Sequence, residues 1–133
     1  MKGNKINVYR PVPLMNAFIT GLVASSGNCG YVSQFGAILT GIVSGVLSKY
    51  VQGLVDRLEL DDPLNVTQIH FAGGIWGAIS IGLLHEDVGL FYHGDPSLFF
   101  VQLLYVAMII LWAAICATAF FCACSTFNRL RID

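Results

Sequence analysis

Residues 97–127 read SLFFVQLLYVAMIILWAAICATAFFCACSTF, and no Asp, Glu, Lys or Arg occurs among them. An α-helix needs about 20 predominantly apolar residues to cross the hydrocarbon core of a bilayer. This run is long enough and apolar enough to do so. It therefore predicts a membrane-spanning helix, and it directs the interpretation of the rest of the chain.

The composition of the whole chain agrees with a membrane location. The chain has 133 residues, enough for one domain, of which 56% are hydrophobic and 11% charged. A soluble domain carries about 25% charged residues. The charges cluster near the N-terminus, in the middle and at the C-terminal end, and no basic patch suggests a nucleic-acid partner. The sequence therefore predicts an all-α integral membrane protein.

Three further apolar runs occur earlier in the chain, before residues 97–127. They predict helices at about 11–26, 33–54 and 63–84, joined by short polar links. With 97–127, this gives four membrane helices. The polar residues 1–10 do not resemble a signal peptide, and we expect them and residues 128–133 to lie in the cytoplasm.

The positions of the basic residues support this orientation. With four spans, all seven lie on one side of the membrane, whereas three or five spans would scatter them. Positive residues concentrate in cytoplasmic loops, so both termini are predicted to be cytoplasmic. The seven are Lys2, Lys5, Arg10, Lys49, Arg57, Arg129 and Arg131.

Glycines recur inside two of the expected helices. Small residues four apart form a strip against which another helix can pack closely. The pattern predicts that these helices belong to a bundle. The glycines expected at helix contacts are Gly41, Gly45, Gly73, Gly74 and Gly77.

One titratable residue lies deep in an expected span. Asp62 is predicted to cap the third helix and Pro63 to be its first helical residue, which places His70 roughly 10 Å along the axis. A histidine inside a membrane commonly marks a proton or substrate pathway. The alternative is a structural histidine hydrogen-bonded to a neighbouring helix, as we expect for Asn16 and Gln102.

Other reactive residue types form no recognisable site. Cys122 and Cys124 are two apart, which is not a common zinc spacing, and His85 and His93 are expected to be solvated in an outer loop rather than to bind metal. No nucleophile–base set or phosphate-binding loop occurs. The sequence therefore predicts no enzyme, no metal site and no cofactor.

Residues 61–77, DDPLNVTQIHFAGGIWG, resemble the signature of the Amt/Mep ammonium transporters. Residues 21–24 (GLVA) and 29–32 (CGYV) resemble that family's link between its eighth and ninth spans. Residues 128–132 (NRLRI) resemble the close of its eleventh span. The resemblance covers nearly the whole chain after Arg10.

This resemblance implies a fold of eleven helices in two inverted halves, assembled as a homotrimer in the plasma membrane. Residues 11–127 would supply spans eight to eleven. His70 would be the second of two histidines that face each other across a narrow hydrophobic pore, and Val66 would line that pore. Ammonium would give up a proton there and cross as ammonia. Potassium would be excluded because it has no proton to lose and is costly to dehydrate.

The sequence departs from the family pattern in two places. Phe71 stands where the family has a small glycine, and Asn65 stands where an acid is common. The resemblance also implies that the first seven spans are absent, so we expect that the chain alone does not transport ammonium. Two alternatives stay open: an ammonium sensor on the same fold, and a truncated product that modifies trimers of a full-length relative.

Overall fold

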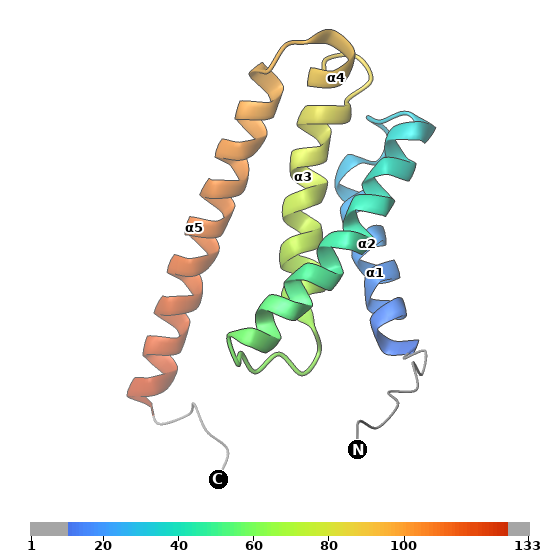
Figure 1. Ribbon diagram of the computed structural model, residues 1–133. Coiled ribbons are helices and arrows are strands. Elements are labelled where there is room, and N and C mark those ends of the chain that lie inside the picture. The colour runs from blue at the N-terminus through green and yellow to red at the C-terminus, as the bar shows by residue number, and fades with distance from the viewer. Residues whose placement is uncertain (1–10, 128–133) are drawn as a thin grey trace, which may run out of the picture.

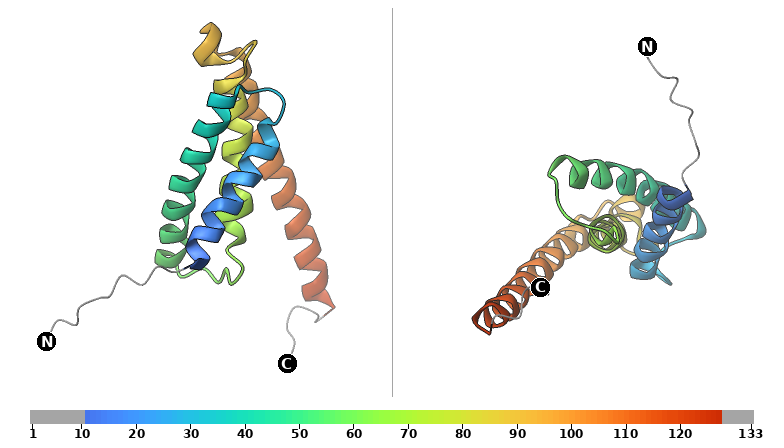
Figure 2. Two further views of the ribbon diagram at one scale, coloured as in Figure 1. Left: turned by 90° about the vertical axis from the view of Figure 1, so that its right-hand side faces the viewer. Right: turned by 90° about the horizontal axis from the view of Figure 1, so that it is seen from below.

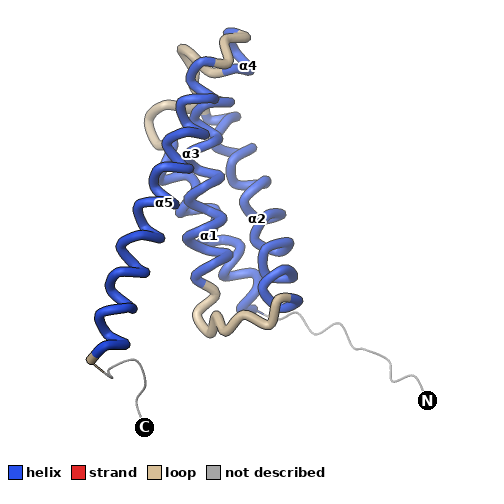
Figure 3. Tube along the Cα trace, turned by 90° about the vertical axis from the view of Figure 1, so that its left-hand side faces the viewer, coloured by secondary structure: helices blue, strands red, loops and turns tan. Residues whose placement is uncertain are grey.

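The computed structural model describes residues 11–127, and every regular element within them is helical (Figure 3). The predicted cytoplasmic ends, 1–10 and 128–133, with five of the seven basic residues, lie outside the described residues. The all-α prediction is confirmed for the described part. The elements are α1 (Pro11–Asn28), α2 (Gln34–Arg57), the π-helix η1 (Thr67–Ala72), α3 (Gly73–Leu84), α4 (Leu90–His93) and α5 (Ser97–Thr126).

The helices form a small bundle with one outlying member. Helix α1 packs against α2 and α3, and η1 continues directly into α3 (Figure 1). Helix α5 contacts α3 near the α4 end and diverges from the bundle toward its own C-terminus (Figures 1 and 2). The start of α1, the end of α2 and the end of α5 therefore lie at the same end of the molecule.

Several boundaries differ from those expected from the sequence. Helix α1 extends to Asn28 and α2 to Arg57, both slightly beyond the apolar runs. The short helix α4 occupies part of the link that was expected to be irregular. An isolated β-bridge between Val32 and His85 joins that link to the α1–α2 link.

Two helices satisfy the length and hydropathy of a membrane span on their own. These are α2, with 24 residues, and α5, with 30 residues, in which an 18-residue window reaches a mean hydropathy of 1.4 and 2.5, respectively. Helix α5 is exposed along most of its length, and Val106 is its one buried residue. The count of four spans stays a prediction.

The distribution of side chains is the reverse of that in a soluble protein. Large apolar side chains such as Trp112 and Phe18 are about 70% exposed. The largest of the fully buried side chains are small and polar instead. In water this arrangement would be unfavourable, whereas a bilayer solvates apolar side chains and favours polar contacts between helices. The most deeply buried polar residues are Thr20, Asn28, Thr40, Ser44, Ser48, Gln68 and Ser80.

Glycine allows α3 to approach its neighbours at backbone distance. A Cβ atom on Gly77 would lie 2.6 Å from the carbonyl oxygen of Ala24 in α1, and one on Gly73 would lie 3.1 Å from that of Thr20. The packing of α3 on α1 therefore depends on these two residues having no side chain.

The remaining glycines differ in whether a Cβ atom added to them would meet a neighbouring helix. A Cβ atom on Gly82, in α3, would lie 2.6 Å from the Cα atom of Phe99, in α5. A Cβ on Gly41, Gly45 or Gly74 would meet nothing within 4 Å. A packing role for these three stays a prediction.

We predict that Gly77→Ala destabilises the bundle, whereas Gly74→Ala does not. The new methyl group at Gly77 would overlap the backbone of Ala24 and force α1 and α3 apart, at a cost of about 1–3 kcal/mol. At Gly74 there is open space, and alanine favours a helix by about 1 kcal/mol over glycine. The measurement is unfolding in mixed micelles followed by circular dichroism. Equal destabilisation by both substitutions would contradict the assigned contact.

Candidate functional site

His70 lies in the middle of the π-helix η1. A π-helix forms its backbone hydrogen bonds between residues five apart, one more than in an α-helix, is rare, and occurs frequently at functional sites. Gly73, directly after η1, has α-helical dihedral angles, so the chain returns at once to the regular helix α3. The distortion is therefore confined to the turn that carries the histidine.

The carboxylate of Asp62 holds the start of this turn. Its Oδ1 accepts a hydrogen bond from the backbone N–H of Val66 and its Oδ2 one from that of Thr67, both at 2.8 Å. Asn65 adopts a left-handed conformation with φ of 56°, and its N–H donates to the backbone oxygen of Asp62. The chain thus turns back on Asp62 before the helix begins.

This turn corrects the expected helix start. Pro63 is not the first helical residue but lies in the turn that precedes the helix. Asp62 acts on the N–H groups four and five residues ahead, not on those two or three residues beyond an ordinary N-cap. Asn65 suits the turn because asparagine tolerates the left-handed region better than most residues.

The hydrogen bonds to Asp62 favour its charged form. The backbone N–H of Thr67 lowers the pKa of this carboxyl below its ordinary value, with further help from the Thr67 side chain and the Val66 N–H, although partial desolvation opposes them. A carboxylate at the start of a helix also interacts favourably with the helix dipole. Asp62 is therefore ionised at neutral pH and anchors η1.

His70 faces an apolar groove of about 480 Å³ between the η1–α3 segment and α5. It is the one titratable side chain among the lining residues, and it is exposed within the described chain. From η1 and α3 the groove is lined by His70, Phe71, Gly74, Ile75 and Ala78, and from α5 by Val106, Ile109, Ile110, Ala113, Ala114 and Ala117.

The structure places Val66 and Phe71 differently with respect to this groove. Val66, at the start of the η1 turn, is 48% exposed and is not among the lining residues. Phe71 is 53% exposed and does line the groove beside His70. The bulky Phe71 therefore projects away from the α1–α3 contact and leaves that packing undisturbed.

Polar contacts between helices lie on other faces of α3 and η1. The amide of Asn28 donates to the hydroxyl of Thr40 at 2.8 Å and to that of Ser80 at 2.9 Å, which links α1, α2 and α3. The hydroxyl of Ser48 donates to Oε1 of Gln68. These side chains satisfy one another inside the bundle and leave the groove apolar.

Sequence reasoning missed Asn28 and Gln68 and favoured other residues. The side chains of Asn16 and Gln102 take part in none of the interhelical hydrogen bonds formed within residues 11–127, and neither does His70. The described helices therefore give no support to the alternative of a structural, hydrogen-bonded histidine.

The histidines of the outer link have local partners. Nδ1 of His85 accepts from the N–H of Asp87 at 3.1 Å, and Nε2 of His93 lies 3.2 Å from the backbone oxygen of Glu86. Across residues 11–127, no group of three or more His, Cys, Asp or Glu side chains could hold a metal ion.

Comparison with known proteins gives a consistent family match. Residues 2–133 match the Ammonium Transporter Family. The chain is 35% identical over 137 residues to ammonium transporter 3 of Dictyostelium discoideum, covering 94% of this chain and 32% of that protein. It is 31% identical over 99 residues to ammonium transporter Amt1 of Archaeoglobus fulgidus, covering 71% of this chain and 25% of the relative. It is 28% identical over 132 residues to ammonium transporter 1 member 1 of Arabidopsis thaliana, covering 89% and 26%.

The chain thus spans about a third or less of the length of these curated relatives. No solved structure gives a significant match.

We predict that Asp62→Asn disturbs the environment of His70. An amide offers one acceptor oxygen where the carboxylate offers two, so one of the two N–H groups at the start of η1 loses its partner. The ring resonances of His70 should shift in the NMR spectrum of the solubilised, histidine-labelled chain. Asp95→Asn is the matched control, because Asp95 accepts from Ser97 at the start of α5. Equal shifts of the His70 resonances in both variants would contradict a specific role for Asp62.

We also predict a loss of stability in acid that depends on Asp62. Because the folded-state pKa of Asp62 lies below its ordinary value of 3.8, its stabilising contribution is present above that value and is lost as the pH falls through the folded-state pKa. The thermal midpoint of the chain should therefore decline below about pH 4. The decline should be smaller in Asp62→Asn, and an identical pH profile in the two proteins would show that Asp62 does not contribute.

Proposed function

This chain belongs to the ammonium transporter family, and from that premise we propose that it forms one wall of a pore that conducts ammonium across a membrane. The family consists of transporters, so the chain is not an enzyme, and family membership places it in a membrane. The observation that carries the proposal is the position of His70, held by a π-turn at the edge of an apolar groove.

The finer architecture is part of the proposal. Helices α1, α2, η1–α3 and α5 are four membrane spans, and they correspond to spans eight to eleven of the eleven-helix fold. Helix α5 supports a membrane position most directly, because its apolar surface is exposed along nearly its whole length. The complete protein is proposed to be a homotrimer in the plasma membrane.

The chemistry follows from an apolar pathway beside a proton acceptor. An ammonium ion cannot enter an apolar groove with its charge except at a large cost in free energy, whereas neutral ammonia can. A neutral imidazole accepts one hydrogen bond and can take up a proton near neutral pH. His70 is proposed to act with a second histidine, supplied by the remainder of the pore, and the two histidines together accept the proton of ammonium. Val66 is proposed to line the same pore one turn away.

The geometry around His70 supports this role in two ways. The imidazole is exposed rather than committed to the interhelical hydrogen bonds of the bundle, so it is available to a substrate. The turn that presents it is fixed by the two hydrogen bonds to Asp62. A proton relay needs its groups held at defined distances, and a fixed turn meets that need.

The test uses a chimera, because residues 11–127 leave His70 open on one side. The segment of the Dictyostelium relative that matches this chain is replaced by residues 11–127. The chimera is expressed in cells without ammonium transporters of their own, and uptake of isotopically labelled methylammonium is measured. We expect uptake by the chimera and none by the 133-residue chain alone.

Within this chimera, we predict that His70→Phe lowers uptake by at least about tenfold, since it removes the proton acceptor and keeps the bulk. His93→Phe is the control, because His93 lies in the outer link, away from the groove. Unchanged uptake in His70→Phe would refute the assignment of His70. Uptake by the unmodified 133-residue chain would refute the proposal that it supplies one wall of the pore.

A further inference from the structure

Gln68 and His70 lie on opposite faces of the π-helix η1. The Gln68 side chain is 3% exposed, whereas the His70 side chain is exposed and lines the apolar groove toward α5. The chain turns by about 100° per residue in an α-helix and by slightly less in a π-helix, so side chains two residues apart point in nearly opposite directions. Helix η1 packs against α1 and α2. A contact that holds Gln68 inside the bundle therefore also determines where the imidazole points.

A hydrogen bond from α2 holds the Gln68 side chain. The hydroxyl of Ser48, which is also buried, donates to Oε1 of Gln68 at 3.3 Å. Among residues 11–127, no other side-chain hydrogen bond joins η1 to another helix. A buried amide oxygen that loses its donor is unfavourable, because no water takes the place of the partner. The pair therefore ties the turn that carries His70 to α2.

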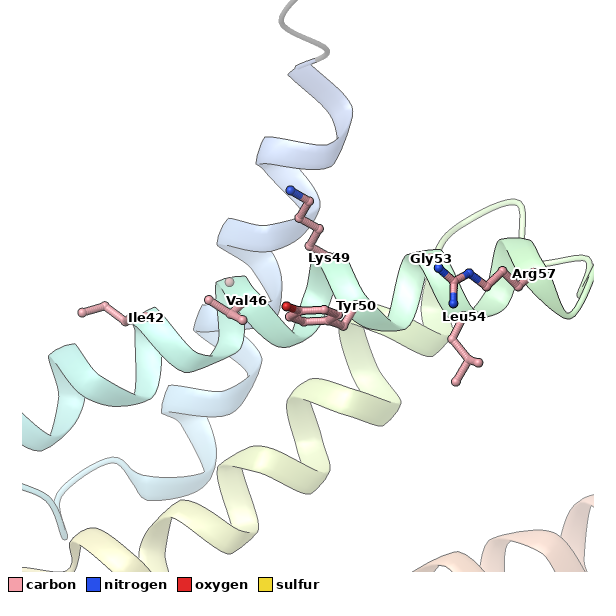
Figure 4. Close-up of a pocket in the computed structure, with 8 residues that line it drawn as sticks. Ile42, Val46, Lys49, Tyr50, Gly53, Leu54 and Arg57 are labelled. Carbon is pink, nitrogen blue, oxygen red and sulfur yellow. The ribbon is translucent and has the colours of Figure 1, made fainter.

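Ser48 belongs to the inward face of α2. Thr40, Ser44 and Ser48 follow one another at four-residue spacing, and all three side chains are buried. Exposed side chains of the same helix, such as those of Val46 and Tyr50, line a separate groove (Figure 4). The hydroxyl of Ser44 donates at 2.6 Å to the backbone oxygen of Thr40, within α2 itself. Ser44 thus resembles Ser48 in residue type, helix and burial but makes no contact of this kind with η1.

The π-turn is held at three points. Asp62 fixes the backbone where η1 begins, and the close approach of Gly73 to the backbone of Thr20 fixes it where η1 ends. If the turn relaxed to the commoner α-helical hydrogen bonds, the side chains within it would rotate by up to about 100° around the axis. The hydrogen bond of Gln68 lies between the two backbone contacts and opposes that rotation. It therefore preserves the orientation of His70.

We propose that Gln68 is a positioning residue for His70, and that its hydrogen bond with Ser48 keeps the imidazole facing the apolar groove. Gln68 is not among the residues that line this groove, so it acts through His70 and not on the substrate. A reacting group displaced by about 1 Å loses much of its effectiveness. The consequence for uptake rests on the proposed function of His70, whereas the consequence for the orientation of the ring does not.

The first test reads the orientation of His70 without transport. Ser48→Ala is made in the histidine-labelled, solubilised 133-residue chain, and the ring resonances are followed by NMR. Ser48 lies 20 residues before Gln68 in the sequence and contacts η1 through its hydroxyl, so the effect on His70 passes through Gln68. We expect the resonances of His70 to shift and those of His85 and His93, in the outer link, to stay unchanged.

Ser44→Ala is the matched control, since it removes a buried hydroxyl from the same helix but leaves the Gln68 contact intact. It should leave the His70 resonances in place. Unchanged His70 resonances in Ser48→Ala would overturn the proposal. An equal shift in Ser44→Ala would also overturn it, because the effect would then belong to the packing of α2 in general.

A double variant tests whether the two residues act as a pair. Gln68→Met keeps the length of the side chain and removes the acceptor. Once the acceptor is gone, the hydroxyl of Ser48 has no further influence on His70. The shift in Ser48→Ala/Gln68→Met should therefore equal that in Gln68→Met alone. Additive shifts would show that the two residues act independently, against the proposal. If Gln68→Met does not fold, the comparison of Ser48→Ala with Ser44→Ala decides.

The second test measures methylammonium uptake by the chimera that carries residues 11–127. Loss of one buried hydrogen bond corresponds to roughly a fivefold change, so Ser48→Ala and Gln68→Met should each lower the maximal rate by about that factor. The half-saturation concentration should stay unchanged, because Gln68 does not line the groove. Ser44→Ala should keep the parent rate.

The two proposals fail in different ways. If His70→Phe lowers uptake but Ser48→Ala and Gln68→Met do not, the positioning role is wrong and the pore assignment stands. If His70→Phe leaves uptake unchanged, the pore assignment is wrong, and the resonances of His70 alone decide whether Gln68 orients the ring. A fall in uptake without a shift of the His70 resonances would overturn the positioning role, since a general loss of packing would then account for it.

Discussion

The approach of α3 to α1 at Gly73 and Gly77 is the contact on which the rest of the structure depends. In a bilayer, apolar side chains gain little by leaving lipid for protein, so helices associate through close packing and polar contacts. The absence of two side chains brings the backbones together. That approach places Asn28, at the end of α1, within hydrogen-bonding distance of Ser80 on α3 and of Thr40 on α2. One small-residue contact thus determines where three helices meet.

Much of the fold follows from the sequence because its main determinants are local. Apolar runs and glycine spacing predict the helices and the bundle. Asp62 stands out as a charged residue at the start of one of these runs, and His70 stands out as a titratable residue inside it. The π-turn could not be predicted, since it depends on the left-handed Asn65 and on Asp62 reaching four and five residues ahead. No periodicity of side chains reveals such a backbone arrangement.

The buried polar network illustrates a different limit. Asn16 and Gln102 are as polar as Asn28 and Gln68, and residue type alone cannot tell which of them faces a partner. A signal was present in the small residues at four-residue spacing on the other face of α2, namely Gly36, Thr40, Ser44 and Ser48. The same stripe contributes to the lower mean hydropathy of the 18-residue apolar window in α2, which is 1.4 against 2.5 in α5. Helices that pack inside a membrane bundle therefore give weaker hydropathy signals than helices that face lipid.

The composition of α5 bears on what His70 can do. Opposite the histidine, α5 supplies Ala113, Ala114 and Ala117, whose small side chains leave the groove open, together with branched apolar residues. Polar side chains there would solvate an ion and make deprotonation unnecessary for passage. An apolar lining excludes ions of any kind, so discrimination between ammonium and potassium then depends on which of them can give up a proton. In the proposed pore, selectivity arises because one proton acceptor lies beside an apolar surface that cannot solvate a charged species.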